Sequence, residues 1–340
     1  MRRVLRGAGL PEFSNDGEEP AQGASPIGML GYQILRRISA LSAIWAVGSV
    51  YGADLDLSNL QVPRQHIGTG GVPPDGVPSI DAPKFWSVDR AEKYLFKGDL
   101  VMSVPDGETA RAYPLRIMTW HEVVNDEIEG RAIAITYCPL CASGMVFSRE
   151  IAEAVNGRLE FGVSGLLYHS DVVLYDRESL GLWSQLSRKA ISGKFAGREL
   201  EWIPSSQMTW QAWKRNYPDG QVLSTEKGFD RPYTQSPYEG YTRIPFPVVK
   251  VPTARNNLPM KARIVGIILE GKARAYNVSG LRTGEYLEQI GDRSIRITYD
   301  RRARLLLAED ASGESIPVVW SYWFAWQAFY PETTLVKKLR

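Results

Sequence analysis

Several residue types and motifs are scarce or missing in this 340-residue sequence, and each absence narrows its function. It contains only two cysteines and three histidines, so a zinc site built from two pairs of closely spaced ligands lacks its second cysteine pair. The patterns G-x-x-x-x-G-K-[ST], G-x-S-x-G and H-E-x-x-H are absent. A phosphate-binding loop, a serine hydrolase and a zincin therefore lack support. A net charge of only +2 argues against nucleic acid as a partner.

Long hydrophobic runs are also scarce, and the one near the N-terminus reads as an export signal. Arg36 and Arg37 precede an apolar run at residues 38–50, and small residues follow around Gly52. This order is typical of a secretory signal peptide, and the run is too short for a membrane span. We therefore expect an exported protein, periplasmic or extracellular, with a signal peptide at about residues 29–53 and no transmembrane span in the mature chain. A buried core helix is the alternative.

The start of the chain is unusual, because the apolar run lies far from Met1. Residues 1–28 are rich in Gly, Pro, Glu and Ser, and Met29 lies just ahead of the run. The first 28 residues are therefore either an atypical extension or the result of a start assigned too early.

The rest of the chain is organised around residues 133–147. Their first half alternates apolar and small residues, as in a half-buried strand, and Pro139 should end that strand in a turn. Both cysteines, Cys138 and Cys141, flank this turn at C-x-x-C spacing, and Met145 follows four residues later. We expect this turn to carry the chemistry of the protein.

Composition and repeats predict a mainly β protein with short helices (α+β), built from two internally duplicated β-rich units packed as one body. Three segments recur in the same order. They are Ala110-Arg-Ala-Tyr113 and Ala273-Arg-Ala-Tyr276, Ile135-Thr-Tyr137 and Ile297-Thr-Tyr299, and Trp210-x-Ala-Trp213 and Trp323-x-Ala-Trp326. The second copy has Asp300 where the first has Cys138, and it contains no histidine. Chemistry is therefore expected in the first unit.

The expected organisation has five parts. They are the extension and signal peptide (1–53), a turn-rich wrapping segment (54–94), the first β-rich unit (95–226), a Pro-rich linker (227–254) and the second, degenerate unit (255–340). Within them we expect a helix at 87–95 capped by Ser87 and strands at 100–104, 110–117, 131–137, 162–168 and 172–175. His121 should lie in the connection that leads into the cysteine strand, and His169 in a polar turn between two buried strands.

Three interpretations of the cysteine pair remain open. A structural disulfide would close only a very short loop and stabilise little, and a thioredoxin-like redox pair would need a helix after the strand rather than a further strand. A soft-metal site would use Cys138, Cys141, Met145 and His121, with His169 and then His66 in reserve. Sulfur and imidazole ligands favour copper, and zinc is a less favoured alternative.

The functional expectation follows from that site. We expect an exported copper-binding protein, either an oxidoreductase or a carrier of electrons or copper, whose partner is a small molecule or a redox protein. The alternatives are a periplasmic thiol–disulfide protein and a metal-free binding module. We expect Asp171, Asp176 and Arg177 to form ion pairs or turn caps, or to hold the ligands of the site in place by hydrogen bonds.

The chain also resembles a known family. The resemblance rests on six motifs: Pro74-Asp-Gly-Val-Pro-Ser-Ile-Asp81, Trp120-His-Glu-Val-Val-Asn-Asp126, Thr136-Tyr-Cys-Pro-Leu-Cys141, Ser164-Gly-Leu-Leu-Tyr168, Leu174-Tyr-Asp-Arg177 and Leu182-Trp-Ser-Gln185. They are similar to those of the domain-of-unknown-function family 3179, from about residue 60 to the C-terminus. The resemblance implies a secreted or membrane-anchored prokaryotic protein and implies no particular activity. It also implies Asn at the position of His169.

Overall fold

The structure is a computed structural model that describes residues 54–338, apart from residues 227, 250, 252–254 and 256. The expected extension and signal peptide lie outside the described residues. Among the residues that are described, no helix is long and apolar enough to cross a membrane.

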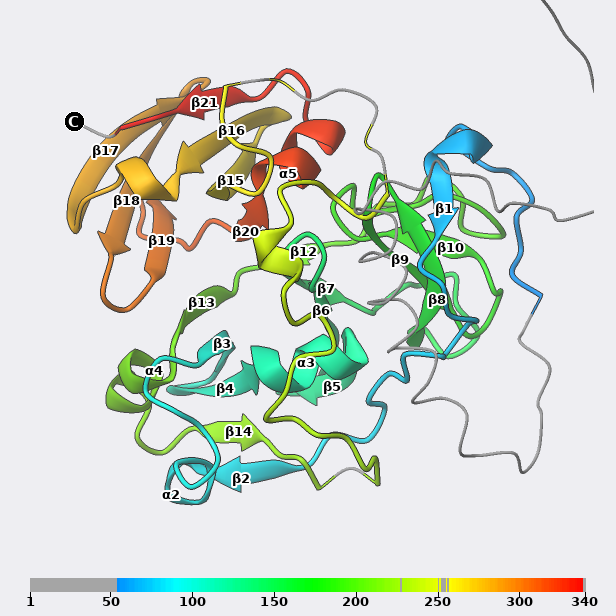
Figure 1. Ribbon diagram of the computed structural model, residues 1–340, viewed down its shortest axis with the longest axis horizontal. Coiled ribbons are helices and arrows are strands. Elements are labelled where there is room, and N and C mark those ends of the chain that lie inside the picture. Colours follow the sequence, from blue (N-terminus) through cyan, green and yellow to red (C-terminus); the bar gives the residue numbers. More distant parts are fainter. Residues whose placement is uncertain (1–53, 227, 250, 252–254, 256, 339–340) are drawn as a thin grey trace, which may run out of the picture.

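The fold is mainly β, as expected, with few and short helices. Its strands form five small sheets, seen in Figure 1 at the right, the centre, the bottom and the upper left of the molecule. The sheet at the right, the insert sheet, has the order β1 (Ile67–Thr69), β8 (Phe161–Tyr168), β9 (Asp171–Asp176), β10 (Leu182–Ser184) and β11 (Lys189–Ala190). The central sheet, the cysteine sheet, has the order β12 (Trp202–Ile203), β7 (Ser143–Ser148), β6 (Arg131–Cys138) and β5 (Val123–Ile128).

Two further sheets carry the repeated Trp helices, and a fifth stands beside them. The lower sheet has the order β13 (Ser206–Thr209), β3 (Leu100–Asp106), β4 (Thr109–Pro114), β14 (Gln221–Leu223) and β2 (Phe85–Ser87). The upper sheet has the order β20 (Val318–Tyr322), β15 (Arg263–Leu269), β16 (Lys272–Asn277) and β21 (Thr334–Val336). The fifth is β17 (Gly284–Ile290), β18 (Arg293–Asp300) and β19 (Leu305–Asp310).

The helices are single or double turns between strands. They are α2 (Val88–Ala91), α3 (Leu115–His121), α4 (Trp210–Asn216) and α5 (Trp323–Phe329), with 3-10 turns η1 (Arg64–His66), η2 (Tyr241–Arg243) and η3 (Val278–Gly280). The Ser87 side chain caps α2 by accepting from the backbone N–H of Arg90, as predicted, but the helix ends at Ala91. The strand expected at 110–117 stops at Pro114, and residues 115–117 open α3 instead. Proline fixes φ at a value that suits the start of a helix, so Pro114 favours a helix here although the β-branched Ile117 favours a strand.

The upper and lower sheets share one strand topology. In each, an antiparallel three-strand group (β13-β3-β4 or β20-β15-β16) is followed by a parallel strand (β14 or β21) that comes directly after the Trp helix. The register also agrees, because Ser103 pairs with Ala112 in the lower sheet and Gly266 with Ala275 in the upper one. Two of the three repeated segments thus occupy equivalent places in or beside these two sheets, and the third lies in β6 of the cysteine sheet and in β18 of the fifth sheet.

The cysteine sheet is buried on both faces because the insert sheet covers one of them. Along β6, Ile133, Ile135 and Tyr137 join one hydrophobic cluster, and Ala134 and Cys138 join another. The second cluster also contains core residues of β8, β9 and β10. Alternation along a strand sends successive side chains to opposite faces. The face that carries Cys138 therefore packs against the insert sheet.

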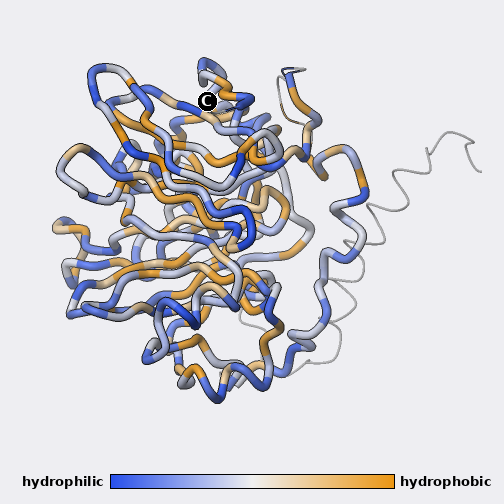
Figure 2. The backbone as a smooth tube through the Cα atoms, turned by 90° about the vertical axis from the view of Figure 1, so that its left-hand side faces the viewer, coloured by the Kyte–Doolittle hydropathy of each residue, from blue (hydrophilic) through white to orange (hydrophobic). Residues whose placement is uncertain are grey.

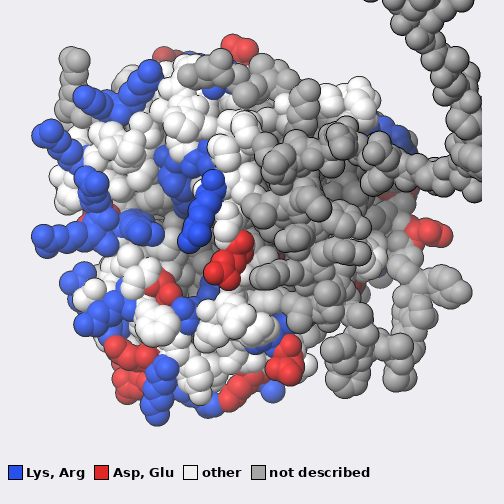
Figure 3. All heavy atoms as spheres, in the orientation of Figure 1, with Lys and Arg blue, Asp and Glu red and all other residues white. Residues whose placement is uncertain are grey.

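The side of the molecule seen in Figure 3 carries residues of both charges. Lys and Arg gather at the left, and Asp and Glu lie mainly below. Figure 2, which views the molecule from another side, shows hydrophilic residues at the outer turns and hydrophobic stretches within the strands. This pattern is ordinary for a globular β protein.

Candidate metal-binding site

Two buried thiols and one buried carboxylate meet at the end of β6. The sulfurs of Cys138 and Cys141 and a carboxylate oxygen of Asp171 all lie within 4.8 Å of one another. Both cysteines are free, and no side chain of the three is more than 1% exposed. We call Cys138, Cys141 and Asp171 the donor cluster.

Local backbone geometry brings these three residues together. Cys138 pairs with Ser143, so residues 139–142 form a tight loop that contains Pro139 and returns directly into β7. Asp171 enters from the hairpin between β8 and β9, where Tyr168 pairs with Asp171. That hairpin is a two-residue turn in which both central residues, His169 and Ser170, have positive φ, at 52° and 68°. Such turns prefer Asn and Gly, and His tolerates positive φ better than most residues.

The second half of the chain holds the cysteine loop in place. The backbone N–H of Tyr322 donates to the carbonyl oxygen of Cys141 at 2.8 Å, at the end of β20. The Cys141 thiol donates to the carbonyl oxygen of Ser170 at 3.1 Å. Ala142 takes a positive φ of 51° in the same loop. Strained residues of this kind persist only where the surrounding structure determines them, and they cluster at functional sites.

The donor cluster is held by polar partners of its own. The backbone N–H of Leu186 donates to Asp171 Oδ2 at 3.0 Å. The Ser143 hydroxyl lies 3.1 Å from Asp171 Oδ1 and donates to Gln185 Oε1 at 2.7 Å. The Gln185 amide in turn donates to Thr136 Oγ1 at 2.8 Å. This network fixes the orientation of the Asp171 carboxyl toward the sulfurs.

Burial governs the acid–base state of these groups. It raises the pKa of Asp171 to about 7 and raises the pKa values of the thiols of Cys138 and Cys141, that of Cys141 most strongly. Buried anions without a cation are costly, and a group responds by holding its proton. In the absence of a cation the cluster therefore favours its neutral, protonated form.

Two further side chains stand beside the cluster. The Tyr241 side chain is buried. Burial raises the pKa of its hydroxyl, the charges of Cys141 and Cys138 add to this rise, and a hydrogen bond from the backbone of Val248 opposes it. The Lys261 ammonium donates to the carbonyl oxygen of Tyr241 at 2.7 Å. Burial lowers the pKa of Lys261 to about 8, and the charge of Cys141 opposes that change. A buried hydroxyl and a partly buried ammonium therefore lie near the sulfurs.

A narrow pocket with a cavity volume of about 40 Å³ reaches Cys138. Its walls are mostly apolar, and its polar side chains besides Cys138 are those of Glu122 and Tyr238. Glu122 follows α3 with a left-handed φ of 59° and is 7% exposed. The Tyr238 hydroxyl donates to Glu122 Oε1 at 2.9 Å, and burial raises the pKa of Glu122 to about 7. We call this space the Glu122 pocket.

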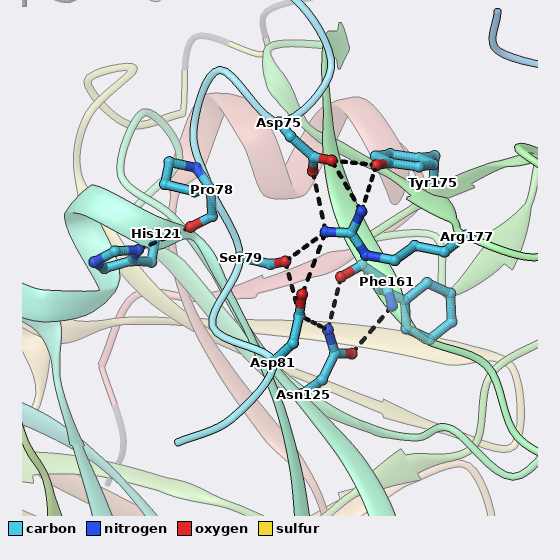
Figure 4. Close-up of polar contacts among 9 residues, drawn as sticks. All are labelled: Asp75, Pro78, Ser79, Asp81, His121, Asn125, Phe161, Tyr175 and Arg177. Atoms are coloured by element: carbon cyan, nitrogen blue, oxygen red, sulfur yellow. Dashed lines mark hydrogen bonds and ion pairs between the residues drawn. The ribbon is translucent and has the colours of Figure 1, made fainter. Parts of the chain in front are cut away.

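One wall of the Glu122 pocket is formed by residues 70–81, which we call the strap. Arg177, at the end of the insert sheet's hairpin, donates to Asp75, Ser79 and Asp81 of the strap (Figure 4). Asn125 of β5 donates to Asp81 and to the carbonyl oxygen of Phe161. The strap is therefore tied to both the insert sheet and the cysteine sheet.

The strap can approach β8 closely because of a glycine. Gly165 lies at a register shift in β8 with a φ of +75°, and a Cβ there would stand 2.1 Å from the carbonyl oxygen of Val72. A side chain at this position would therefore displace the strap and open the pocket wall.

Comparison with known families agrees with these motifs. The model of the family described as "Protein of unknown function (DUF3179)" matches residues 74–320, which is more than half of the chain. The chain belongs to this family. No curated protein and no solved structure matches it.

In this DUF3179 chain, the histidines lie apart from the donor cluster. His121, which we predicted as the leading imidazole ligand, ends α3, the short helix that connects β4 to β5, and it is not among the residues of the cluster. Its Nδ1 bonds to the carbonyl oxygen of Pro78 at 2.8 Å and its Nε2 to the Tyr233 hydroxyl at 2.7 Å. A carbonyl only accepts, so Nδ1 donates to Pro78. His121 thus ties the strap to α3 (Figure 4).

The reserve ligands form a separate group. His169 contacts the rings of Tyr168, His66 and Phe329, with centroid distances of 4.1, 5.0 and 5.5 Å. Burial lowers the pKa of His169 to about 4. Neither His169 nor His66 belongs to the donor cluster.

Met145 remains close to the sulfurs in the packing. It pairs with Thr136 on β6, two residues from Cys138 along the strand. It is 1% exposed and belongs to the same hydrophobic cluster as both cysteines.

The prediction for Arg177 and Asp176 agrees with the structure, and the one for Asp171 was too modest. Arg177 pairs with Asp75 and Asp81, and Asp176 accepts from Ser179 and from the indole N–H of Trp183. Asp171 lies in the donor cluster itself. The sequence analysis assigned no role to Glu122, although a charged residue directly before the apolar pair Val123-Val124 was a visible signal.

Proposed function

We propose that Cys138, Cys141 and Asp171 bind a metal ion, and that the protein is a metal-binding protein. The observation that carries this proposal is the donor cluster: three buried donor atoms within 4.8 Å of one another. Tetrahedral bonds of roughly 2.3 Å to sulfur and 2.1 Å to oxygen place ligand atoms about 3.5–3.8 Å apart. Closing the cluster around an ion therefore requires movements of about 1 Å or less at each side chain.

The chemistry of the surroundings supports an ion at this place. A metal replaces the protons of thiols and carboxyls, and so removes the cost of burying these groups as anions. The buried Tyr241 hydroxyl accepts from the backbone of Val248, and its own proton is available for a thiolate or for a further ligand of the ion. The network through Ser143 and Gln185 orients the carboxyl in the way that hydrogen-bonded neighbours orient metal ligands.

Zinc suits the donor cluster better than copper. The deprotonated cluster carries three negative charges, one for each residue. Lys261 is a nearby cation, because the charge of Cys141 acts on the pKa of its ammonium group. A divalent ion leaves one negative charge beside Lys261, whereas copper(I) leaves two. A carboxylate is also a harder ligand than copper(I) prefers. With three protein ligands, zinc keeps a fourth position for water or substrate, as in catalytic zinc sites.

Copper remains the second candidate because of Met145. A thioether beside two thiolates is a soft donor set that selects copper(I), and Met145 shares the hydrophobic cluster of the sulfurs. A thiol–disulfide function is less well supported, since two buried thiols with raised pKa values are poor nucleophiles.

We further propose that the chain is exported and that its two Trp-helix sheets arose by duplication. Export rests on the arginines and short apolar run ahead of residue 53. The duplication is supported by the shared strand order and register of the upper and lower sheets.

The test is metal analysis of the purified full chain together with four variants. We expect about one zinc ion per chain, lost in Cys138→Ser and Cys141→Ser, because three ligands are the minimum of a catalytic zinc site. Asp171→Asn should weaken zinc binding by more than about tenfold, since even the loss of a residue that only hydrogen-bonds to a metal ligand lowers metal affinity about 10–100-fold. Met145→Leu, of similar volume, should leave zinc binding unchanged.

The other outcomes separate the alternatives. If the chain binds copper, and if Met145→Leu loses this copper whereas Asp171→Asn keeps it, the site is a soft-metal site and the zinc proposal is wrong. A metal-free chain with a reducible bond between Cys138 and Cys141 would favour the thiol–disulfide function. A chain that binds no metal in excess zinc or copper, and forms no such bond, would leave a metal-free binding module.

A further inference from the structure

The Glu122 pocket combines apolar walls with one carboxyl in a strained backbone. Eight of its lining side chains are branched aliphatic groups: Val72, Val77, Leu140, Val163, Leu166, Leu167, Val172 and Val248. No Lys, Arg or His lines it. The cavity volume of about 40 Å³ is several times the roughly 10–15 Å³ that one ordered water needs.

Glu122 is costly at this position, and its contacts within the fold do not account for it. It takes a left-handed φ of 59° directly after α3, a place where helices commonly end in Gly because a side chain there strains the backbone. Its carboxyl is buried, and Tyr238 donates the one hydrogen bond that the structure gives it. No ion pair involves it among the described residues. A buried carboxyl that lines a pocket and accepts a single hydrogen bond from the fold is a candidate for ligand binding.

The position of Cys138 links the pocket to the donor cluster. Cys138 lines the pocket, whereas Cys141 and Asp171 do not. A molecule in the pocket therefore meets the cluster from the side of Cys138, with Glu122 and Tyr238 as the other polar contacts.

We propose that the Glu122 pocket binds a small uncharged molecule with a short aliphatic body and a hydrogen-donating head group, such as a primary amide or an alcohol. The aliphatic walls take the body, and Glu122 accepts a hydrogen bond from the head group beside Cys138. Anions are excluded, because the walls offer no cation and Glu122 is itself acidic. The inference deepens the proposed metal site, since it assigns that site a substrate class.

Access to Cys138 gives a direct test on the metal-free chain. Methyl methanethiosulfonate is small and neutral, and a thiolate displaces methanesulfinate from it to leave a methyl disulfide on the cysteine. Mass spectrometry of peptides follows each cysteine separately. We expect Cys138 to react before Cys141. Val77→Phe, which narrows the pocket, should slow the reaction of Cys138 by about tenfold or more. Val155→Phe is the matched control, because Val155 is 80% exposed.

Protection from labelling identifies the ligand class. In alkaline buffer, where Glu122 is ionised, propionamide at about ten times its Kd should slow labelling of Cys138 about tenfold. Propionate, of the same shape but anionic, should not protect. In Glu122→Gln the two compounds should protect about equally, because the charge that distinguishes them is gone.

Two results would overturn the inference: equal protection by propionamide and propionate in the unmodified chain, or equal labelling rates in Val77→Phe and Val155→Phe. Circular dichroism checks that each variant is folded. The labelling needs no metal, so its outcome is independent of metal analysis, and failure of the pocket is distinguishable from failure of the metal site.

Discussion

Replacing Asp171 by asparagine should stabilise the metal-free chain while it weakens metal binding. The Asp171 side chain is fully buried, and burial raises its pKa from 3.8 to about 7. An amide resembles the protonated acid in shape and carries no charge. Its oxygen can accept from the Leu186 N–H, and its NH₂ can donate to the Ser143 oxygen, whose own proton goes to Gln185. The substitution therefore keeps the local hydrogen bonds.

The magnitude and its sign follow from the pKa of Asp171. Between pH 3.8 and about 7 the folded chain holds a proton that the unfolded chain has released. Stability from this group is thus fully present below the unfolded pKa and is lost as the pH rises through about 7. A shift of about three units, at about 1.36 kcal/mol each, gives a loss of up to about 4 kcal/mol in the free energy of unfolding. The asparagine variant does not incur this loss.

Urea unfolding in excess chelator, at about pH 4 and about pH 8, measures the effect. We expect Asp171→Asn to exceed the unmodified chain in stability at the higher pH by up to about 4 kcal/mol, and the difference to vanish near pH 4. Asp176→Asn is the control on the same strand. Its carboxylate accepts from the Ser179 N–H, the Ser179 hydroxyl and the Trp183 indole, so an amide there should destabilise. If Asp171→Asn is the less stable chain at about pH 8, the reasoning about the buried carboxyl is wrong.

Three other substitutions test the surroundings of the site. Arg177→Leu should lower stability by about 1–2 kcal/mol and speed hydrogen exchange of the strap, whereas Arg158→Leu, which breaks an exposed pair, should change stability by less than about 0.5 kcal/mol. Equal exchange of the strap in both variants would show that Arg177 does not hold the strap in place. Tyr241→Phe removes a buried hydroxyl near the sulfurs and should weaken zinc binding while changing the stability of the metal-free chain by less than about 1 kcal/mol, as zinc titration and melting with chelator would show. Gly266→Ala places a Cβ 2.3–2.5 Å from the Trp326 ring and should cost about 1–3 kcal/mol in urea unfolding; no loss would mean that this ring is free to move.

Local chemistry determined much of what could be read from the chain. Proline after Cys138 ends β6 there, and the alternation of residues 133–137 specifies a strand whose faces differ. The polar turn between the apolar runs 162–168 and 172–175 is a hairpin, as predicted. Two of the three repeated segments occupy equivalent strands and helices. Each of these features depends on residues close together in sequence, so periodicity and turn chemistry suffice to find it.

The sequence indicated both cysteines of the proposed site, but only the tertiary structure showed which residue joins them. His121 is closer in sequence to Cys138 than Asp171 is, yet α3 directs it toward Pro78 and Tyr233, while the β8–β9 hairpin brings Asp171 to the sulfurs. The choice depends on how the insert sheet packs over the cysteine sheet, and no spacing in the sequence records that packing. Burial also decides the chemistry, because the pKa values of Asp171 and Glu122 rise only when distant segments exclude water from both.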